Sequence, residues 1–216
     1  VKGVAATVAA CAPADLDALM ECKYNGSELT VAQQQQEMVL VIGENIKVRR
    51  FARYAEGVSV PYVHAGGKIG VLVNLETGLT AGQVTELGKN IAMQIAALNP
   101  RFWDKSQVTQ EVLDEEKKVM LAQMENDPKM AGKPEQVREK IVMGKLNKFY
   151  AENCLLQQDS VRADVFEGTV EAYIAHAAKE LGGEIKFKDA IRFEKGEGIE
   201  KKQENFADEI ASLVKG

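Results

Sequence analysis

The sequence predicts an α+β fold in which a β-β-α-α-β unit with an antiparallel sheet occurs twice, and three patterns support this. From Asn45 to Tyr54, apolar Ile46 and Val48 alternate with charged residues, which is the two-residue period of a strand with one face on a core. Two β-prone runs within Tyr62–Asn74 flank Ala65-Gly66-Gly67, a pattern typical of a hairpin whose turn needs positive φ. Segments with helical periodicity lie on either side of these strands.

The composition indicates an ordinary soluble protein. The 216 residues are 45% hydrophobic and 27% charged, enough for one large core or two small ones. The net charge of −5 argues against general binding to a phosphate backbone but allows a local basic patch. No apolar run approaches the roughly 18–20 residues that span a bilayer, and the first residues lack the charged lead-in of a signal peptide.

Three cysteines, Cys11, Cys22 and Cys154, lie far apart and show no CxxC spacing. An odd, sparse set of this kind is typical of a reducing compartment, so we expect free thiols and a cytoplasmic location.

The first quarter of the chain reads as helices followed by the alternating strand. Val1–Ala10 carries valines on one face and is predicted as a buried helix that ends before Pro13. Leu16–Leu29 is polar and is predicted as a loop with one helical turn. Thr30 can cap a helix that runs to Ile42 and stops at Gly43.

A third helix, Leu79–Leu98, follows the hairpin and stops at Asn99-Pro100. Two charged helices with narrow apolar stripes then run through residues 106–149, and Pro and Gly residues separate them. Two helices that have narrow apolar stripes and are joined by such a break favour an antiparallel helical hairpin, or coiled coil, that projects from the globular body. The alternative is that both belong to the main core. The expected stripe residues are Val108, Val112, Glu116, Val119 and Gln123 in the first helix, and Val137, Ile141, Leu146 and Phe149 in the second.

The remaining elements are a helix over Thr169–Leu181, a strand over Glu184–Lys195 and a final helix over Glu204–Val214. The predicted domains are an N-terminal core subdomain at 1–57, a C-terminal core subdomain at 58–105 and 150–200, the hairpin at 106–149, and a C-terminal helix at 201–216.

The repeat emerges when the chain is compared with itself. Thr30–Gly57 aligns with Thr169–Gly196 without a gap, and Val1–Pro13 aligns with Gly88–Pro100. Both alignments keep the order helix, helix, strand, so we interpret the chain as a duplication. The first copy begins opposite Gly88, so we expect it to lack its N-terminal hairpin. If that copy never had the hairpin, its strand would be an unpaired edge.

Residues able to carry chemistry are few. The chain has two histidines. His176 falls within a predicted helix, where a packing role is favoured. His64 borders the glycine-rich turn, so its side chain can project from the surface and make a contact. No Cys–His pair, Ser/His/Asp arrangement or metal-ligand spacing is evident, so no catalytic residue, metal or cofactor is predicted. Gly66-Gly67 and Gly182-Gly183 lack the patterns of phosphate-binding loops.

Lys140, Lys145 and Lys148 give the second hairpin helix a basic face. Such a face could contact RNA, although a solvated surface is the commoner role.

Five stretches of the sequence resemble the translation elongation factor Ts family, in the family's order. The central one is Val41-Ile-Gly-Glu-Asn-Ile-Lys-Val-Arg-Arg-Phe51. The others are Tyr62-Val-His-Ala-Gly-Gly-Lys-Ile-Gly-Val-Leu-Val73, Ile91-Ala-Met-Gln-Ile-Ala-Ala-Leu-Asn-Pro100, the region from Lys140 to Leu156, and Ile191-Arg-Phe-Glu-Lys-Gly-Glu-Gly-Ile-Glu200. Together they span nearly the whole chain.

The resemblance implies a guanine nucleotide exchange factor for elongation factor Tu, built from two related core subdomains and a protruding coiled coil. It implies that Ile42, Gly43 and His64 dock on the partner's nucleotide-binding domain, in its GDP-bound and nucleotide-free states, with further contacts from the coiled coil and C-terminal helix. We expect no membrane association and no direct nucleic-acid contact, and a homodimer is left open. Two alternatives remain: an RNA- or ribosome-associated module using the lysine face, and an enzyme using Cys154 or His176.

Two features of the family do not occur in these 216 residues. One is an N-terminal helical module resembling a ubiquitin-associated domain, and the other is a Thr-Asp-Phe-Val-Ala-Lys motif whose Asp-Phe pair perturbs the partner's magnesium and phosphate site. The family places that motif directly before the helix that opens this chain. The expected docking site therefore includes no Asp-Phe pair.

Overall fold

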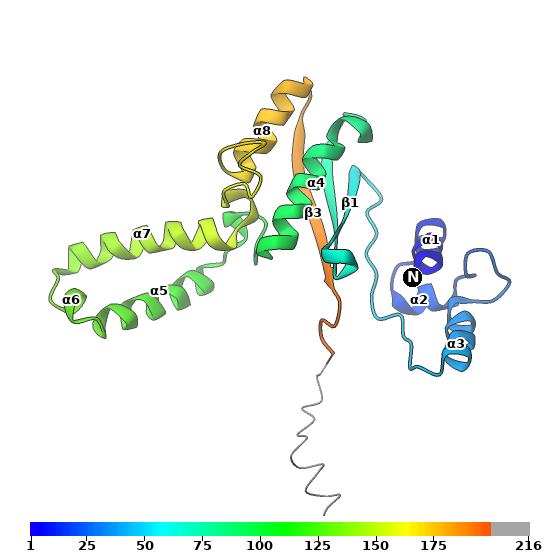
Figure 1. The fold of residues 1–216 in the computed structure, drawn as a ribbon. Coiled ribbons are helices and arrows are strands. Elements are labelled where there is room, and N and C mark those ends of the chain that lie inside the picture. The colour runs from blue at the N-terminus through cyan, green and yellow to red at the C-terminus, as the bar shows by residue number, and fades with distance from the viewer. Residues whose placement is uncertain (200–216) are drawn as a thin grey trace, which may run out of the picture. The chain divides into compact units, whose positions relative to one another are not determined.

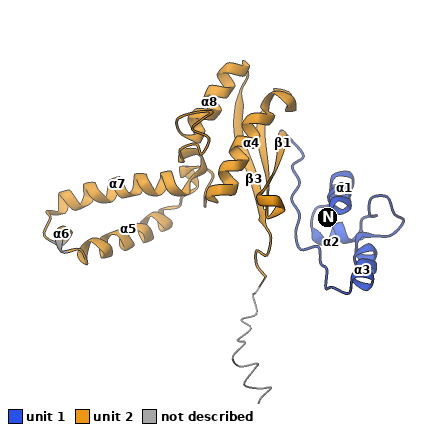
Figure 2. Cartoon of the chain, in the orientation of Figure 1, with its two compact units in different colours: residues 1–57 blue, residues 58–216 orange. Residues whose placement is uncertain are grey.

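A computed structural model describes residues 1–199, apart from the side chains of Pro128 and Ala131. The chain divides into two compact units, the first at Val1–Gly57 and the second beginning at Val58 (Figure 2). The predicted helix over Glu204–Val214 and the predicted domain at 201–216 lie outside the described residues.

The first unit is built from three helices, α1 (Lys2–Cys11), α2 (Leu16–Glu21) and α3 (Val31–Ile42) (Figure 1). Their core contains buried Val8, Leu19 and Val31, with Val48 and Phe51 packed against it. The helices predicted over Val1–Ala10 and Thr30–Ile42 are confirmed to within a residue or two.

The expectation that all three cysteines are free thiols is wrong. A disulfide joins Cys11, the last residue of α1, to Cys22, the first residue after α2, and only Cys154 is free. Packing of α1 beside α2 brings the two Cα atoms to 6.5 Å, within the range that a disulfide can bridge. Their separation in the sequence carries no sign of this proximity.

The predicted strand over Asn45–Tyr54 is also wrong, because the structure assigns no strand there. The alternation itself is present, since Ile46 and Val48 are half-buried whereas Lys47 and Arg49 are exposed. A strand also needs a backbone ladder with a neighbour, and residues 45–54 form none. The backbone N–H of Val48 donates instead to the side-chain oxygen Oε1 of Gln35, at 2.8 Å.

The second unit contains a three-stranded antiparallel sheet in the order β1-β2-β3, made of β1 (Val58–His64), β2 (Ile69–Thr77) and β3 (Ile185–Glu194). The predicted hairpin and the predicted strand over Glu184–Lys195 are therefore confirmed. The hairpin turn is a short 3-10 helix, η1 (Ala65–Gly67), whose three residues have φ of 49°, 64° and 93°. The predicted positive φ at this turn is confirmed.

Two helices cover the sheet. Helix α4 (Ala81–Leu98) packs against β1 and β2, and α8 (Val170–Leu181) packs against β3 and α4 (Figure 1). Buried side chains of both helices and of β2 and β3 form the largest core of the described residues. At Gly88 of α4 an added Cβ would lie 2.5 Å from Cγ2 of Val60, so this glycine allows the helix to approach β1 closely.

The helical hairpin is confirmed and consists of α5 (Gln110–Glu125), short α6 (Pro128–Ala131) and α7 (Glu135–Asn153). Short 3-10 helices, η2 (Lys105–Gln107) and η3 (Leu155–Gln157), flank it. Helices α5 and α7 pack on each other, and their buried residues form two clusters separate from the core of the sheet.

The expected apolar stripes of the hairpin are partly wrong. Val119, Gln123 and Val137 are exposed. In the first helix the seam is formed by the next residues along, Met120 and Met124, and in the second Val142 packs there beside the expected Ile141. Helices of 16 and 19 residues with sparse apolar positions permit several closely related stripes, so packing of one helix on the other decides between them.

Several local features recur at the positions aligned by the sequence repeat. Helices α3 and α8 each follow a threonine cap and end at a glycine with left-handed backbone conformation. The second unit has the element order β-β-α-α-β once the hairpin is left aside. No strand occurs in residues 1–57, so the duplicated architecture stays a prediction.

Candidate functional site

The C-terminal end of α3 presents two of the predicted docking residues. Gly43 adopts φ 77° and ψ 13°, and its N–H donates to the carbonyl of Val39 at 2.8 Å, which ends the helix. Ile42 is 49% exposed. The preceding Leu40 and Val41 are more exposed still, at 83% and 81%. The end of α3 therefore exposes three consecutive apolar side chains, an arrangement that is compatible with the predicted docking role.

The other end of α3 is held by its sequence. The side-chain oxygen Oγ1 of Thr30 accepts from the N–H of Gln33, and Oε1 of Gln33 accepts from the N–H of Thr30, which is a capping box. Both helix ends are thus defined by local hydrogen bonds. This fixes where Ile42 and Gly43 lie within the first unit.

His64 is the last residue of β1 and pairs with Ile69 across the hairpin. Its ring nitrogen Nδ1 lies 2.9 Å from the hydroxyl of Tyr62, two residues earlier on the same face of the strand. The two ring centroids are 5.8 Å apart. Tyr62 itself packs against the main core. The imidazole is therefore held by a neighbour that is anchored in the protein.

Ile42 and Gly43 belong to the first unit and His64 to the second. A single docking surface containing all three residues remains a prediction. Tyr62 is not among the residues predicted from the sequence, although its position two residues before His64 on a strand is a sufficient signal. Leu40 and Val41 are not among them either, because they fall outside the apolar line that the helical period assigns to the core.

Cys154 and His176, the residues of the enzyme alternative, both have structural surroundings. The Cys154 side chain is fully buried, and burial together with the negative charge of Asp104 raises the pKa of this thiol to about 11. His176 packs beside the ring of Phe166, with centroids 5.2 Å apart, and its Nε2 lies 3.5 Å from Oε1 of Glu180. A thiol with a raised pKa is a poor nucleophile.

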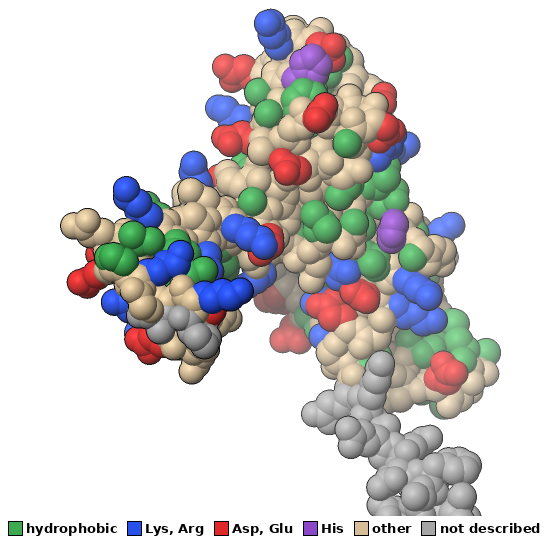
Figure 3. All heavy atoms as spheres, turned by 60° about the vertical axis from the view of Figure 1, so that its left-hand side comes forward, with side chains coloured by type: hydrophobic (Ala, Val, Ile, Leu, Met, Phe, Trp, Pro, Cys, Tyr) green, Lys and Arg blue, Asp and Glu red, His purple; other side chains and the backbone are tan. Residues whose placement is uncertain are grey.

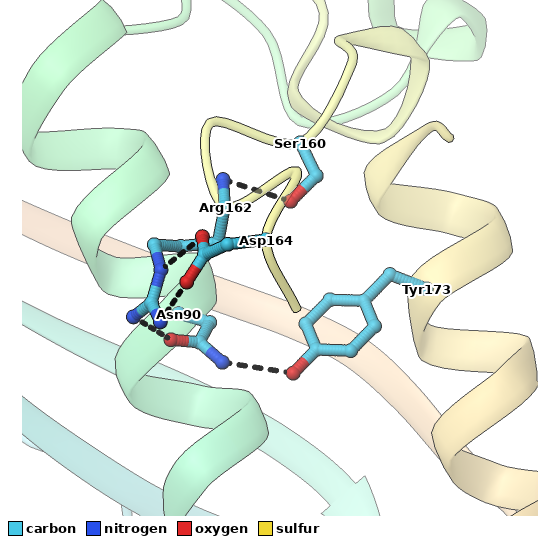
Figure 4. A network of polar contacts seen from close by, with 5 residues as sticks. All are labelled: Asn90, Ser160, Arg162, Asp164 and Tyr173. Carbon is cyan, nitrogen blue, oxygen red and sulfur yellow. Dashed lines mark hydrogen bonds and ion pairs between the residues drawn. The ribbon is translucent and has the colours of Figure 1, made fainter. Parts of the chain in front are cut away.

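Polar groups in the second unit form a network that joins the loop before α8 to the helices (Figure 4). Arg162 donates two hydrogen bonds to the carboxylate of Asp164, at 2.8 and 2.7 Å, and a longer one to Asn90 at 3.3 Å. Asn90 in turn donates to the hydroxyl of Tyr173 at 2.8 Å. The hydrogen bonds from Arg162 lower the pKa of Asp164. These groups satisfy one another, so we assign the network a structural role.

The lysine face of α7 is divided by acidic residues. The Nζ atom of Lys148 lies 3.6 Å from Oε1 of Glu152, and Lys145 lines a groove of about 330 Å³ together with Glu116 and Glu152. On the face that Figure 3 shows, basic and acidic side chains are interspersed. The acidic side chains next to these lysines reduce the positive potential that phosphate binding uses.

Within residues 1–199 no group of three or more His, Cys, Asp or Glu side chains is placed to hold a metal ion. In the same part of the chain, no helix has the length and apolar character needed to cross a membrane.

Comparisons with known proteins agree with one another. A family model described as "Elongation factor TS" matches residues 1–197. Elongation factor Ts of Syntrophotalea carbinolica is 41% identical over 217 residues, covering 99% of this chain and 70% of that protein. Elongation factor Ts of Clostridium kluyveri is 42% identical over 204 residues, covering 93% and 65%, and that of Clostridium tetani is 42% identical over 216 residues, covering 97% and 69%. The chain thus spans about two thirds of the length of these curated relatives.

Proposed function

The chain belongs to the elongation factor Ts family, and from this we propose that it is a guanine nucleotide exchange factor for elongation factor Tu. It would promote GDP release during translation elongation. The observation that carries the proposal is the match of the family model over residues 1–197. The relatives extend beyond the region matched here, so activity of the 216-residue chain itself is part of the proposal.

The proposed mechanism is docking on the nucleotide-binding domain of elongation factor Tu, in its GDP-bound and nucleotide-free states. An exchange factor must bind the nucleotide-free state more tightly, because coupling between nucleotide and exchange factor is reciprocal. Docking through Ile42, Gly43 and His64 would shift the elements around the magnesium and phosphates and so raise the rate of nucleotide release. The exposure of Ile42 at the end of α3 supports this choice of surface.

This function requires no covalent chemistry, so we propose that the chain is not an enzyme in the usual sense. The buried thiol of Cys154 supports this view. We further propose that the protein contacts no nucleic acid directly, and that a homodimer is compatible with its role. The proposed location is the cytoplasm, on the ground that the chain belongs to a family of translation factors. The Cys11–Cys22 disulfide does not support this location, because disulfides are rare in that reducing compartment.

Stopped-flow release of a fluorescent GDP analogue from elongation factor Tu tests the proposal, with the affinity for nucleotide-free elongation factor Tu as a second measurement. We expect Ile42→Asp to weaken binding at least about tenfold, since a charge in an apolar contact is strongly unfavourable. Leu98→Asp is the matched control, because Leu98, like Ile42, is the last residue of its helix and is 49% exposed.

Absence of both binding and accelerated release with the unmodified chain would contradict the proposal. Equal losses in the Ile42→Asp and Leu98→Asp variants would contradict the choice of docking surface. Salt-sensitive binding to RNA in place of elongation factor Tu would favour the alternative of an RNA-associated module.

A further inference from the structure

We infer that Tyr62 is a positioning residue that presents His64 as a hydrogen-bond donor to an acceptor group on the partner. The inference rests on the proposed function and adds the chemistry of one contact. It starts from the 2.9 Å distance between the Tyr62 hydroxyl and Nδ1 of His64.

The backbone and the tyrosine ring are both held in place. His64 forms the last pair of the β1–β2 ladder and directly precedes the tight turn at η1. Tyr62 pairs with Val71, which belongs to the main core, and the tyrosine ring packs against that core. The hydroxyl therefore has a fixed position, and the imidazole that bonds to it has little freedom to turn.

We assign the Tyr62 hydroxyl as the donor and Nδ1 as the acceptor of this hydrogen bond, and that direction determines the tautomer of the imidazole. A tyrosine hydroxyl has one proton to donate, and within residues 1–199 its only side-chain partner is His64. When the hydroxyl donates to Nδ1, the neutral ring carries its proton on Nε2, because each nitrogen's role is set by the bond of the other. In the same residues Nε2 has no hydrogen-bond partner, so its N–H is available for a contact.

The group that meets Nε2–H must be an acceptor, such as a backbone carbonyl, an amide oxygen or a carboxylate. A preset donor loses less conformational entropy when the contact forms than a freely rotating one. Tyr62 thus contributes to docking without touching the partner.

Nitrogen-15 NMR of histidine-labelled protein tests the tautomer without the partner, at a pH where the ring is neutral. We expect the protonated-nitrogen signal at Nε2 of His64 in the unmodified chain, and a mixture of tautomers in Tyr62→Phe. Tyr150→Phe is the control, because Tyr150 is a half-buried tyrosine of the hairpin and should leave the His64 signals unchanged.

Affinity for nucleotide-free elongation factor Tu gives the second measurement. Tyr62→Phe keeps the ring packing and should weaken binding about threefold to tenfold, the range for one neutral hydrogen bond. Glutamine places an N–H near the position of Nε2 and asparagine near that of Nδ1, so His64→Gln should retain more affinity than His64→Asn.

The outcomes separate the two proposals. A proton on Nδ1, or an unchanged spectrum in Tyr62→Phe, overturns the positioning role of Tyr62 and leaves the proposed function intact. The expected spectrum together with unchanged binding of His64→Ala overturns the docking role of His64, and the role of Tyr62 with it. Weaker binding in Tyr62→Phe with the altered spectrum supports both.

Discussion

At the scale of single residues, burial determines what the thiol of Cys154 can do. Its side chain is fully buried and takes part in a cluster with Val108 and Phe149 at the base of the hairpin. Desolvation, followed by the charge of Asp104, raises the pKa of the thiol from its ordinary value of 9.0 to about 11. A cysteine that looks reactive in the sequence is therefore a packing residue in the fold.

This raised pKa predicts a loss of stability at alkaline pH. The unfolded thiol ionises near pH 9.0 and the folded one near about 11, so the stabilising contribution is complete below pH 9 and lost as pH rises to 11. At pH 10.5 we expect ionisation of the thiol in the unfolded state to lower the free energy of unfolding by about 2 kcal/mol. Urea denaturation of the unmodified chain and of Cys154→Ala, at pH 8 and 10.5, measures the difference.

A buried apolar substitution serves as the control. Leu146→Ala should destabilise the hairpin equally at both pH values, since no titrating group is removed. If Cys154→Ala and the unmodified chain lose the same free energy between pH 8 and 10.5, the thiol ionises to the same extent in both states and its pKa is not raised by folding.

At the scale of elements, α3 shows that local sequence can define a helix completely. Thr30 and Gln33 close its first turn, and Gly43 provides the left-handed residue that ends it. An added Cβ at Gly43 would meet no atom within 4 Å, so the requirement for glycine comes from the positive φ alone.

Replacement of this glycine should therefore destabilise the protein through its backbone. We expect Gly43→Ala to reduce the free energy of unfolding by about 1 kcal/mol, because an L-residue is strained in this conformation. Gly144→Ala, within α7 and also without a clash, should increase it by about 0.5–1 kcal/mol. The urea midpoints of both variants measure these changes in the free energy of unfolding. A gain in stability from Gly43→Ala would contradict the explanation by backbone strain.

In the helical hairpin, by contrast with α3, tertiary packing and not local sequence decides which residues make the contacts. Its existence follows from charge, helical period and the Pro/Gly break, but its seam does not. Met120 and Met124 contact the other helix, whereas Val119 stays exposed. Neighbouring positions on a helix differ by about 100°, so a rotation of each helix by about that angle exchanges one stripe for the next.

At the scale of the whole molecule, the two units have unequal means of stabilisation. The second unit has an extensive core around β2, whereas the first has a core of three buried residues and the Cys11–Cys22 disulfide. Small cores commonly need such a covalent link. Closing a loop with a sequence separation of 11 contributes about 2–3 kcal/mol in chain-entropy models.

Reduction should consequently loosen one unit and not the other. We expect a reducing agent to speed amide hydrogen exchange in residues 1–57 while β2 (Ile69–Thr77) stays protected. Mass spectrometry of exchanged peptides gives the comparison. The double variant Cys11→Ser/Cys22→Ser is the control and should respond to the reductant in neither unit. Equal acceleration in β2 would mean that the chain unfolds as a single cooperative body.

The sequence by itself determined the features that depend on neighbouring residues. The capped ends of α3, the positive φ at the β1–β2 turn and the alternation of Ile46 and Val48 all follow from short-range rules. The family signature at residues 41–51 indicated Ile42 and Gly43, and the position beside a glycine-rich turn indicated His64. These signals needed no knowledge of distant contacts.

Only the tertiary structure decided which distant groups meet. It paired Cys11 with Cys22, left residues 45–54 without a ladder and set the seam of the hairpin. It also placed the Tyr62 hydroxyl on the ring of His64. The physical reason is common to all four. A pattern along the chain specifies which face of an element is buried, but the identity of the partner depends on packing that brings separate atoms together.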